Sequence, residues 1–316
     1  MKFAIERYSE KGFQLIRLTD NNSGTYAVLI PANGALLHEF VIMQDGRPQN
    51  IIDNYKDATE LESFIDLSYK SAKMSPFACR IANGKWTYET AELEFGKKFR
   101  DGNAIHGLLF NKPFRITEEL ADETGAAISL RYHYNREDNG YPFDYVCEIR
   151  YVLQAQNVLR LETTITNLDD DAIPLVDGWH PYFTLGGKVN DWIFQLASDT
   201  MLEFDERLIP TGDEVEEHAF HNPVVIGETS IDNCFVLSAA PGSACAVIQN
   251  PANGLTLSIF ASEAYPYLQV FTPDHRQSIA IENLSGAPDA FNNGIGLTTL
   301  EPRRSKTFNA WYVISR

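Results

Sequence analysis

Short segments that alternate between apolar and polar residues recur along almost the whole chain. The clearest are residues 127–134, 145–153 and 158–165, and each is rich in β-branched or aromatic residues. A period of two places successive side chains on opposite faces of a half-buried strand. Clusters of Asn, Asp, Gly and Pro separate the segments, for example at 137–140 and 250–254. The pattern predicts an all-β fold, an antiparallel sandwich or barrel, and argues against alternating βα units.

One segment, residues 57–69, is predicted to form a helix. Thr59 is a candidate N-cap with Glu62 three residues later. An apolar face is expected from Leu61, Phe64, Ile65 and Leu67. No internal repeat, low-complexity tract or Pro/Gly-rich linker divides the chain, so residues 1–316 are predicted to form a single domain.

The chain is strongly acidic. It has 26 Lys and Arg residues against 43 Asp and Glu residues, which gives a formal net charge of −17. Phosphate backbones and anionic lipids should repel such a protein, so nucleic acid and membrane surfaces are not expected partners and a neutral small molecule is favoured. No segment approaches membrane-spanning length, and the first residues lack the apolar core of a signal peptide. A cytoplasmic location is the expectation.

The sequence contains no recognisable cofactor or metal motif. The four cysteines have no CxxC spacing and are predicted to be small buried residues, not disulfides or zinc ligands: Cys79, Cys147, Cys234 and Cys245. His218 and His221 are close in sequence, but no further residue nearby has metal-ligand spacing. A phosphate loop, a dinucleotide fingerprint and a nucleophile elbow are also absent. We therefore expect neither a cofactor nor a metal.

The run from Asp177 to Phe183, Asp-Gly-Trp-His-Pro-Tyr-Phe, places an imidazole among aromatic rings. Pro181 disfavours helical geometry at His180, so this histidine is expected in extended backbone. Aromatic rings can stack on the C–H face of a pyranose, and an imidazole can exchange a proton near neutral pH. By alternation, one of Trp179 and Tyr182 should point into the core and the other toward a sugar. A buried structural histidine is the alternative.

Four further residues are candidates for the same site. Glu282 follows an apolar run, where a carboxylate is costly unless it has a partner or a task. Partial burial would raise the pKa of Glu282 toward the range of a general base. Arg80 lies in an apolar segment before a turn and could bind sugar hydroxyls or an internal acid. His106 precedes a glycine that allows close ligand approach, and Asp232 is either a site residue or a turn former.

Taken in order, these segments resemble the aldose 1-epimerase (galactose mutarotase) family. The segments are Arg-Ile-Ala-Asn-Gly at 80–84, Ile-His-Gly at 105–107, Asp-Asn-Gly-Tyr-Pro at 138–142, Trp-His-Pro-Tyr-Phe at 179–183, Asp-Asn-Cys-Phe at 232–235 and Ile-Glu-Asn at 281–283. Departures from the family pattern at Leu108, Thr184 and Asn283 indicate a divergent branch.

The resemblance implies a β-sandwich with an open polar sugar cleft and an isomerase that interconverts the α and β anomers of a free aldohexose. It implies that Glu282 is the general base for the anomeric hydroxyl and that His180 is the general acid for the ring oxygen. It also implies that Arg80, His106 and Asp232 hold hydroxyls or the ring oxygen. The partner would be a monosaccharide, and the protein a monomer or homodimer.

Three alternatives stay open at this point. A related branch acts on hexose 6-phosphates, for which Lys73 and Lys85 near Arg80 could supply positive charge, although the net charge of −17 favours neutral sugars. A non-catalytic carbohydrate-binding protein would keep the cleft, but would not need both a base and an acid. A glycoside hydrolase would need two carboxyl groups, such as Asp232 and Glu282, and would leave the histidine at 180 without a role.

Overall fold

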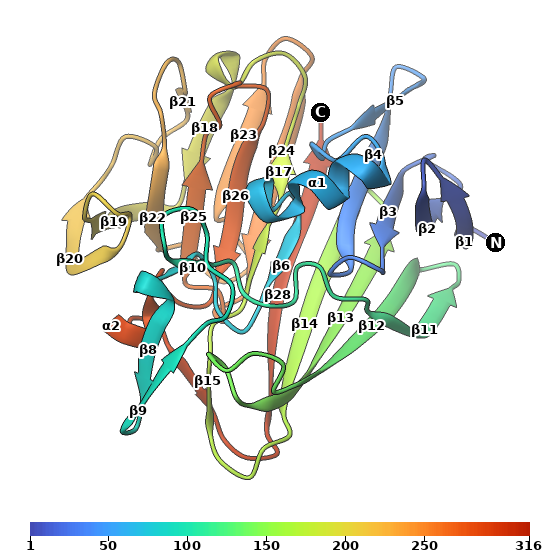
Figure 1. Cartoon of the computed structure of the whole chain (residues 1–316). Coiled ribbons are helices and arrows are strands. Elements are labelled where there is room, and N and C mark those ends of the chain that lie inside the picture. The colour runs from blue at the N-terminus through green and yellow to red at the C-terminus, as the bar shows by residue number, and fades with distance from the viewer.

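The computed structural model describes all of residues 1–316, and antiparallel strands dominate it (Figure 1). The largest sheet has nine strands, in the order β11 (Arg115–Ala121), β12 (Gly125–Asn135), β13 (Asp144–Gln154), β14 (Val158–Asn167), β28 (Ser305–Ser315), β24 (Leu255–Ala261), β23 (Ala246–Asn250), β18 (Ile193–Leu196) and β21 (Val224–Val225). A second sheet has eight, in the order β20 (Pro210–Glu216), β19 (Ser198–Phe204), β22 (Asp232–Leu237), β25 (Tyr267–Phe271), β26 (Ile279–Leu284), β16 (Gly178–His180) and β6 (Ala72–Met74), with β17 (Tyr182–Phe183) also paired to β26.

The long strands form where the sequence alternates most regularly. The three predicted strand segments lie within β12, β13 and β14, which confirms them. In β14 the residues Leu159, Leu161, Thr163 and Ile165 are buried, whereas the side chains between them are exposed or half-buried. This alternation gives the nine-stranded sheet one apolar face, which must be covered.

The eight-stranded sheet covers that face. The ring of Tyr151 on β13 lies 5.8 Å from the ring of Trp179 on β16, and Phe183 on β17 lies 5.1 Å from Tyr312 on β28. A core of 71 buried side chains draws on both sheets. These contacts confirm the predicted all-β antiparallel sandwich.

The predicted helix is present as α1 (Ala58–Ser68), but its cap is not the predicted one. Asp57 has extended backbone, and its carboxylate accepts a hydrogen bond of 2.8 Å from the backbone N–H of Glu60. The prediction of Thr59 as N-cap was therefore wrong, because Thr59 already lies within the first turn.

One face of α1 packs on a five-stranded sheet, formed by β1 (Phe3–Glu10), β2 (Phe13–Asp20), β3 (Tyr26–Ile30), β4 (Leu36–Gln44) and β5 (Arg47–Asn50). Leu61 and Ile65 join a second, smaller core of 11 buried residues together with residues of β2, β3 and β4. Phe64 and Leu67, predicted to belong to the apolar face, are exposed instead. In Figure 1 this helix crosses in front of the sheets.

Short elements complete the fold. The pairs of strands are β7 (Arg80–Ile81) with β10 (Ala104–Ile105), β8 (Lys85–Tyr88) with β9 (Ala91–Glu94), and β15 (Ile173–Leu175) with β27 (Thr298–Leu300). The remaining helical turns are η1 (Ala82–Gly84), η2 (Val189–Asp191) and α2 (Ala290–Asn293). Pairing of β7 with β10 brings the segments around Arg80 and Ile105 together. Both segments line the candidate site, together with residues of the eight-stranded sheet.

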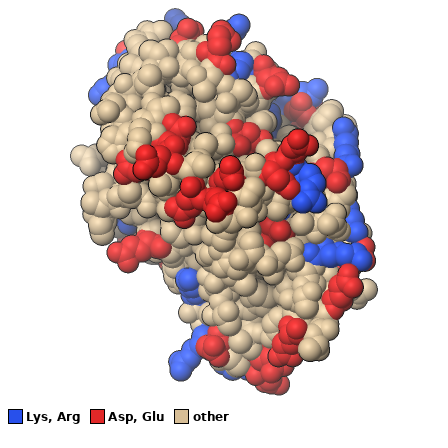
Figure 2. Space-filling model, turned by 90° about the vertical axis from the view of Figure 1, so that its left-hand side faces the viewer, with Lys and Arg blue, Asp and Glu red and all other residues tan.

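Acidic side chains are spread over the face that includes β19 and β20 (Figure 2). This distribution agrees with the formal net charge of −17. None of the helices combines the length and the apolar character that crossing a membrane would require.

Candidate active site

The eight-stranded sheet carries a row of polar side chains across three neighbouring strands. Cys234 on β22 is opposite Gln269 on β25, and Gln269 is opposite Glu282 on β26. Side chains opposite each other in antiparallel strands share a face of the sheet. Asp232, two residues before Cys234, lies on that face as well. Pairing between β22, β25 and β26 therefore brings Asp232 and Glu282 together, although fifty residues separate them in the sequence.

His180 reaches the same face from the end of β16. Its backbone carbonyl accepts a hydrogen bond of 2.9 Å from the N–H of Ser71, and its ring stacks on that of Tyr182, with centroids 5.0 Å apart. Trp179 points the other way, into the core between the sheets. The expectation that one of the two aromatic residues lies in the core is thus confirmed for Trp179, whereas Tyr182 lines the pocket and its contact with a sugar stays a prediction.

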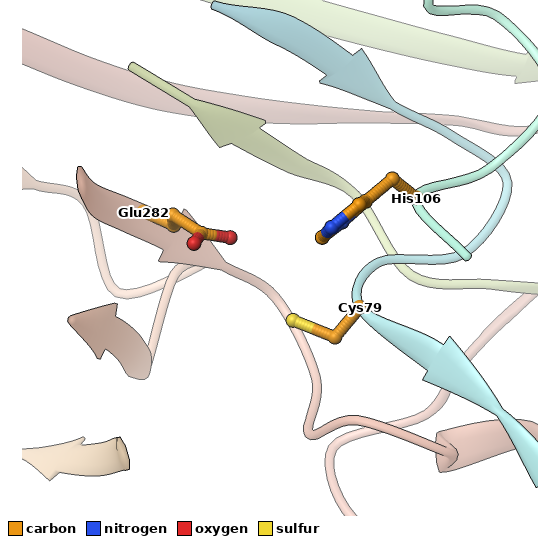
Figure 3. A group of neighbouring side chains, drawn as sticks. All are labelled: Cys79, His106 and Glu282. Atoms are coloured by element: carbon orange, nitrogen blue, oxygen red, sulfur yellow. The ribbon is translucent and has the colours of Figure 1, made fainter. Parts of the chain in front are cut away.

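Besides the eight-stranded sheet and the end of β16, two loops contribute to the site, one before β7 and one after β10. A backbone hydrogen bond joins the two loops. The N–H of His106 donates to the carbonyl of Cys79 at 2.8 Å. Both residues have left-handed backbone, with φ of 56° and 50° respectively, which is uncommon for residues other than glycine. This backbone turns both side chains toward Glu282, as Figure 3 shows. Arg80 follows Cys79 on β7 and is half-buried.

Together these elements enclose a small pocket. All five residues predicted from the sequence line it: Arg80, His106, His180, Asp232 and Glu282. Rings of Tyr69, Phe99, Phe204 and Phe271 provide much of its apolar wall. Its volume of about 180 Å³ is below the roughly 300–1,000 Å³ typical of pockets for drug-sized ligands, so it suits a molecule of monosaccharide size.

His180 and Glu282 form a buried pair at the base of the pocket. The His180 Nε2 atom lies 3.3 Å from Glu282 Oε1, and both side chains are almost completely buried. Burial lowers the pKa of His180 to about 3 and raises the pKa of Glu282 well above its usual range. The Asp232 carboxylate raises the pKa of Glu282 further, and Arg80 partly offsets this. Both shifts favour the uncharged forms, and an uncharged pair carries a single proton, on Glu282.

The other polar residues of the pocket have few partners within the protein. Asp232 Oδ1 accepts a hydrogen bond of 2.7 Å from Gln269 Nε2, and the Arg80 guanidinium contacts Asp101 at 3.3 Å. Glu282 Oε2 and Gln269 Oε1 are buried with no hydrogen-bond partner in the protein. Because buried polar atoms normally have partners, these two are candidates for bonds to a ligand.

Behind the site lies a buried ion pair. Lys73 Nζ on β6 is 2.6 Å from Asp177 Oδ2, and both side chains are completely buried. The same oxygen accepts a hydrogen bond of 2.6 Å from the Tyr265 hydroxyl, and Lys73 also donates to the carbonyl of Gly178. These bonds hold β16, the strand that ends with His180.

This arrangement corrects the idea that Lys73 and Lys85 could supply positive charge to a phosphate. The ammonium of Lys73 is engaged in the core behind the site. Lys85 contacts Glu92 and Glu94 on the β8–β9 hairpin and does not line the pocket. Closeness to Arg80 in the sequence was a poor guide, because the Lys73 side chain is buried against Asp177 and Lys85 lies on the β8–β9 hairpin, outside the pocket lining.

Gly107, next to His106, lies in a position that only glycine can occupy. It has φ of +77°, and a Cβ atom there would be 2.5 Å from both N and O of Ser75. We expect Gly107→Ala to destabilise the protein by at least about 3 kcal/mol, because the clash involves backbone that cannot rotate away. Urea denaturation measures this. In the control Gly187→Ala, φ is +69° but nothing lies within 4 Å, so a loss of only about 1 kcal/mol is expected. Equal losses would contradict the steric argument.

The residues of the pocket lining that were not predicted from the sequence include Tyr69, Cys79 and Gln269. Gln269 is a single polar residue in an otherwise apolar strand, which is the criterion that singled out Glu282, so it could have been found. Cys79 is buried, as are the other three cysteines, and this confirms the predicted burial. Cys79 reaches the pocket because its backbone is left-handed, a conformation that cannot be predicted from the sequence. Tyr69, the C-cap of α1, has the same kind of backbone.

The fold and the site together define an antiparallel β-sandwich protein with a buried carboxyl–imidazole pair in a small aromatic-walled pocket. The family model of aldose 1-epimerases matches residues 15–313, and the chain belongs to that family.

Several relatives support the assignment. The uncharacterised protein YihR of Escherichia coli K12 is 30% identical over 245 residues, covering 75% of this chain and 76% of that protein. The maltose epimerase of Levilactobacillus brevis is 25% identical over 262 residues, which cover 76% and 75% of the two chains. The human galactose mutarotase is 26% identical over 248 residues, which cover 72% and 69%.

Solved structures share the fold. A galactose mutarotase-like protein from Clostridium acetobutylicum superposes with a TM-score of 0.88 over 100% of this chain and 99% of that one, at 19% identity. A galactose 1-epimerase from Lactobacillus acidophilus gives a TM-score of 0.81 at 20% identity, with coverage of 100% and 99%. At these identities the likeness concerns the fold alone.

Proposed function

We propose that this protein is an aldose 1-epimerase that interconverts the α and β anomers of a free aldohexose. The observation that carries the proposal is the buried pair of Glu282 Oε1 and His180 Nε2, 3.3 Å apart in a pocket of monosaccharide size. Ring opening needs one group to take the proton of the anomeric hydroxyl and another to give a proton to the ring oxygen. A neighbouring carboxylate and imidazole can do both.

The single proton of the pair fits this chemistry. In one arrangement the pair is His180 imidazolium and Glu282 carboxylate, which can open the ring. Glu282 then takes the proton of O1 while His180 donates to the ring oxygen, which leaves neutral histidine and carboxylic acid beside the open-chain aldehyde. After rotation about the C1–C2 bond, the reverse transfers close the ring as the other anomer. The pair holds one proton throughout, and burial favours the neutral arrangement that accompanies the open chain.

The rest of the pocket supplies binding and orientation. In the proposal Arg80, His106 and Asp232 hold sugar hydroxyls or the ring oxygen, and the apolar wall packs on the C–H face of the sugar. A free sugar is favoured over a 6-phosphate because Lys73 and Lys85 are both engaged by acids away from the pocket. A matched acid and base in contact also favours turnover over binding alone.

Polarimetry of freshly dissolved α-aldohexoses, or NMR exchange spectroscopy, tests the proposal. We expect the protein to accelerate the approach to anomeric equilibrium for at least one sugar of a panel of neutral aldoses. Relaxation at the buffer rate for every sugar, together with saturable binding, would instead identify a sugar-binding protein. Acceleration confined to 6-phosphates would reject the free-sugar substrate.

Asp232→Asn is expected to weaken substrate binding more than it slows the chemistry. The substitution keeps the shape of the side chain but removes a charged acceptor, and hydrogen bonds to charged groups contribute about 1.5–3 kcal/mol. KM should rise by about 10- to 100-fold while kcat changes less. Initial rates of anomer exchange over a range of sugar concentrations separate the two. A fall in kcat at constant KM would place Asp232 in the chemical step instead.

A further inference from the structure

Three side chains at the pocket floor form a cluster that the proposed reaction does not explain as a group. One ligand atom each from Cys79, His106 and Glu282 lies within 4.8 Å of the others, and all three side chains are buried (Figure 3). All three also line the pocket, so a small ion can reach them. Spacing in the sequence could not reveal this cluster, because its members come from β26 and from the loops beside β7 and β10.

The donor atoms suit a zinc ion. Zn²⁺ is bound in proteins by cysteine sulfur, histidine nitrogen and carboxylate oxygen at about 2.0–2.3 Å. Tetrahedral ligand atoms are then less than about 4 Å apart, so side-chain rotations that move each atom by less than about 1 Å would close the cluster around the ion. Three protein ligands leave the fourth position open toward the pocket.

The surroundings prepare two of the ligands. His106 Nδ1 lies 3.0 Å from Met74 Sδ. Because a thioether sulfur can only accept, the proton belongs on Nδ1, and the lone pair that a metal needs is on Nε2. Glu282 Oε2 is completely buried and has no partner in the protein. The hydrogen bond between His106 and Cys79 fixes their backbones relative to each other. The Asp232 carboxylate adds negative charge beside Glu282.

We propose that Cys79, His106 and Glu282 form a binding site for Zn²⁺ or a similar borderline divalent metal. An ion bound there uses the carboxylate that the sugar reaction needs, so it inhibits anomer exchange reversibly. The inhibition rests on the proposed function, whereas the binding does not.

Cobalt spectroscopy tests the binding without reference to activity. The exposed pair His218 and His221, both close to Asp199, could bind metal at the surface, so the experiment uses the His218→Ala/His221→Ala protein. Adding Co²⁺ to this protein should produce a thiolate-to-cobalt charge-transfer band, and adding Zn²⁺ should displace it. Competition with a chromophoric chelator gives the affinity.

Cys79→Ala should abolish the band and weaken Zn²⁺ binding by more than about 100-fold, because even the loss of a group that only supports a ligand costs about 10- to 100-fold. The matched control Cys245→Ala removes another buried free thiol, which lies away from the cluster, and should keep the band and the affinity. Unchanged affinity in Cys79→Ala, or no band in the parent protein, would overturn the proposal.

A second measurement concerns inhibition. The rate with Zn²⁺ divided by the rate without it should be far below one for the parent protein and close to one for Cys79→Ala, and EDTA should restore the parent rate. Cobalt binding in a protein that exchanges no sugar would refute the proposed function and leave the metal site standing. A protein that exchanges sugar anomers but binds no cobalt would refute the metal site and leave the proposed function standing.

Discussion

Glu282→Gln should lower the rate of anomer exchange by about 10²- to 10⁴-fold, the usual contribution of a general acid or base. The amide keeps the size of the side chain and cannot take a proton from the anomeric hydroxyl. The variant should fold at least as stably as the parent, because one carboxylate oxygen is already buried without a partner and the substitution removes a buried acid. Polarimetry with the preferred sugar gives the rate, and thermal unfolding gives the stability.

Glu263→Gln is the matched control, since this glutamate is exposed on the surface and does not line the pocket. Its rate should equal that of the parent. If Glu282 and His180 act as one unit, adding His180→Asn to Glu282→Gln should cost little more than either change alone. A Glu282→Gln protein with near-parental activity would remove the carboxylate from the mechanism.

Asp177→Asn should destabilise the protein by about 3–5 kcal/mol, as expected when one partner of a buried ion pair is removed. The substitution leaves the fully buried ammonium of Lys73 without its counter-charge, and it replaces the acceptor that Tyr265 uses. The free energy of unfolding in urea measures the loss.

Two further variants test whether the loss in Asp177→Asn comes from the buried charge that is left unpaired. Asp66→Asn breaks an ion pair with Lys97 in which both side chains are about half exposed, and it should cost no more than about 1 kcal/mol. The double variant Lys73→Met/Asp177→Leu removes both charges and should recover much of the stability. If Asp177→Asn cost no more than Asp66→Asn, the pair would not be an essential support of β16.

The sequence predicted the fold class well because alternation follows directly from one buried and one exposed face. It predicted β14 best, where every second residue is buried. It predicted the helix α1 but not its details: the N-cap is Asp57 and not Thr59, and Phe64 is exposed. Local propensity cannot decide between neighbouring cap candidates when the chain before the helix sets the backbone direction.

Several residues of the candidate site could be predicted from the sequence one by one, but the full lining of the pocket could not. Glu282 and His180 were suggested by ionisable groups in apolar or aromatic context, and the structure brings both into one pocket with Arg80, His106 and Asp232. Their catalytic and binding roles stay predictions. The prediction for Lys73 was wrong because a lysine close to a site in the sequence can point to the opposite face of the sheet. Cys79 was not predicted because a left-handed backbone has no signature in the sequence.

Glu282 and His180 lie far apart in the chain, and this separation has a consequence for folding. β26 must pair with β16, about a hundred residues earlier, before Glu282 and His180 meet. Closing so long a loop has an entropic cost that is recovered only when the sheet is assembled, and contacts of this range form slowly. We therefore expect Glu282 and His180 to come together late in folding, after β26 has joined β16 in the eight-stranded sheet.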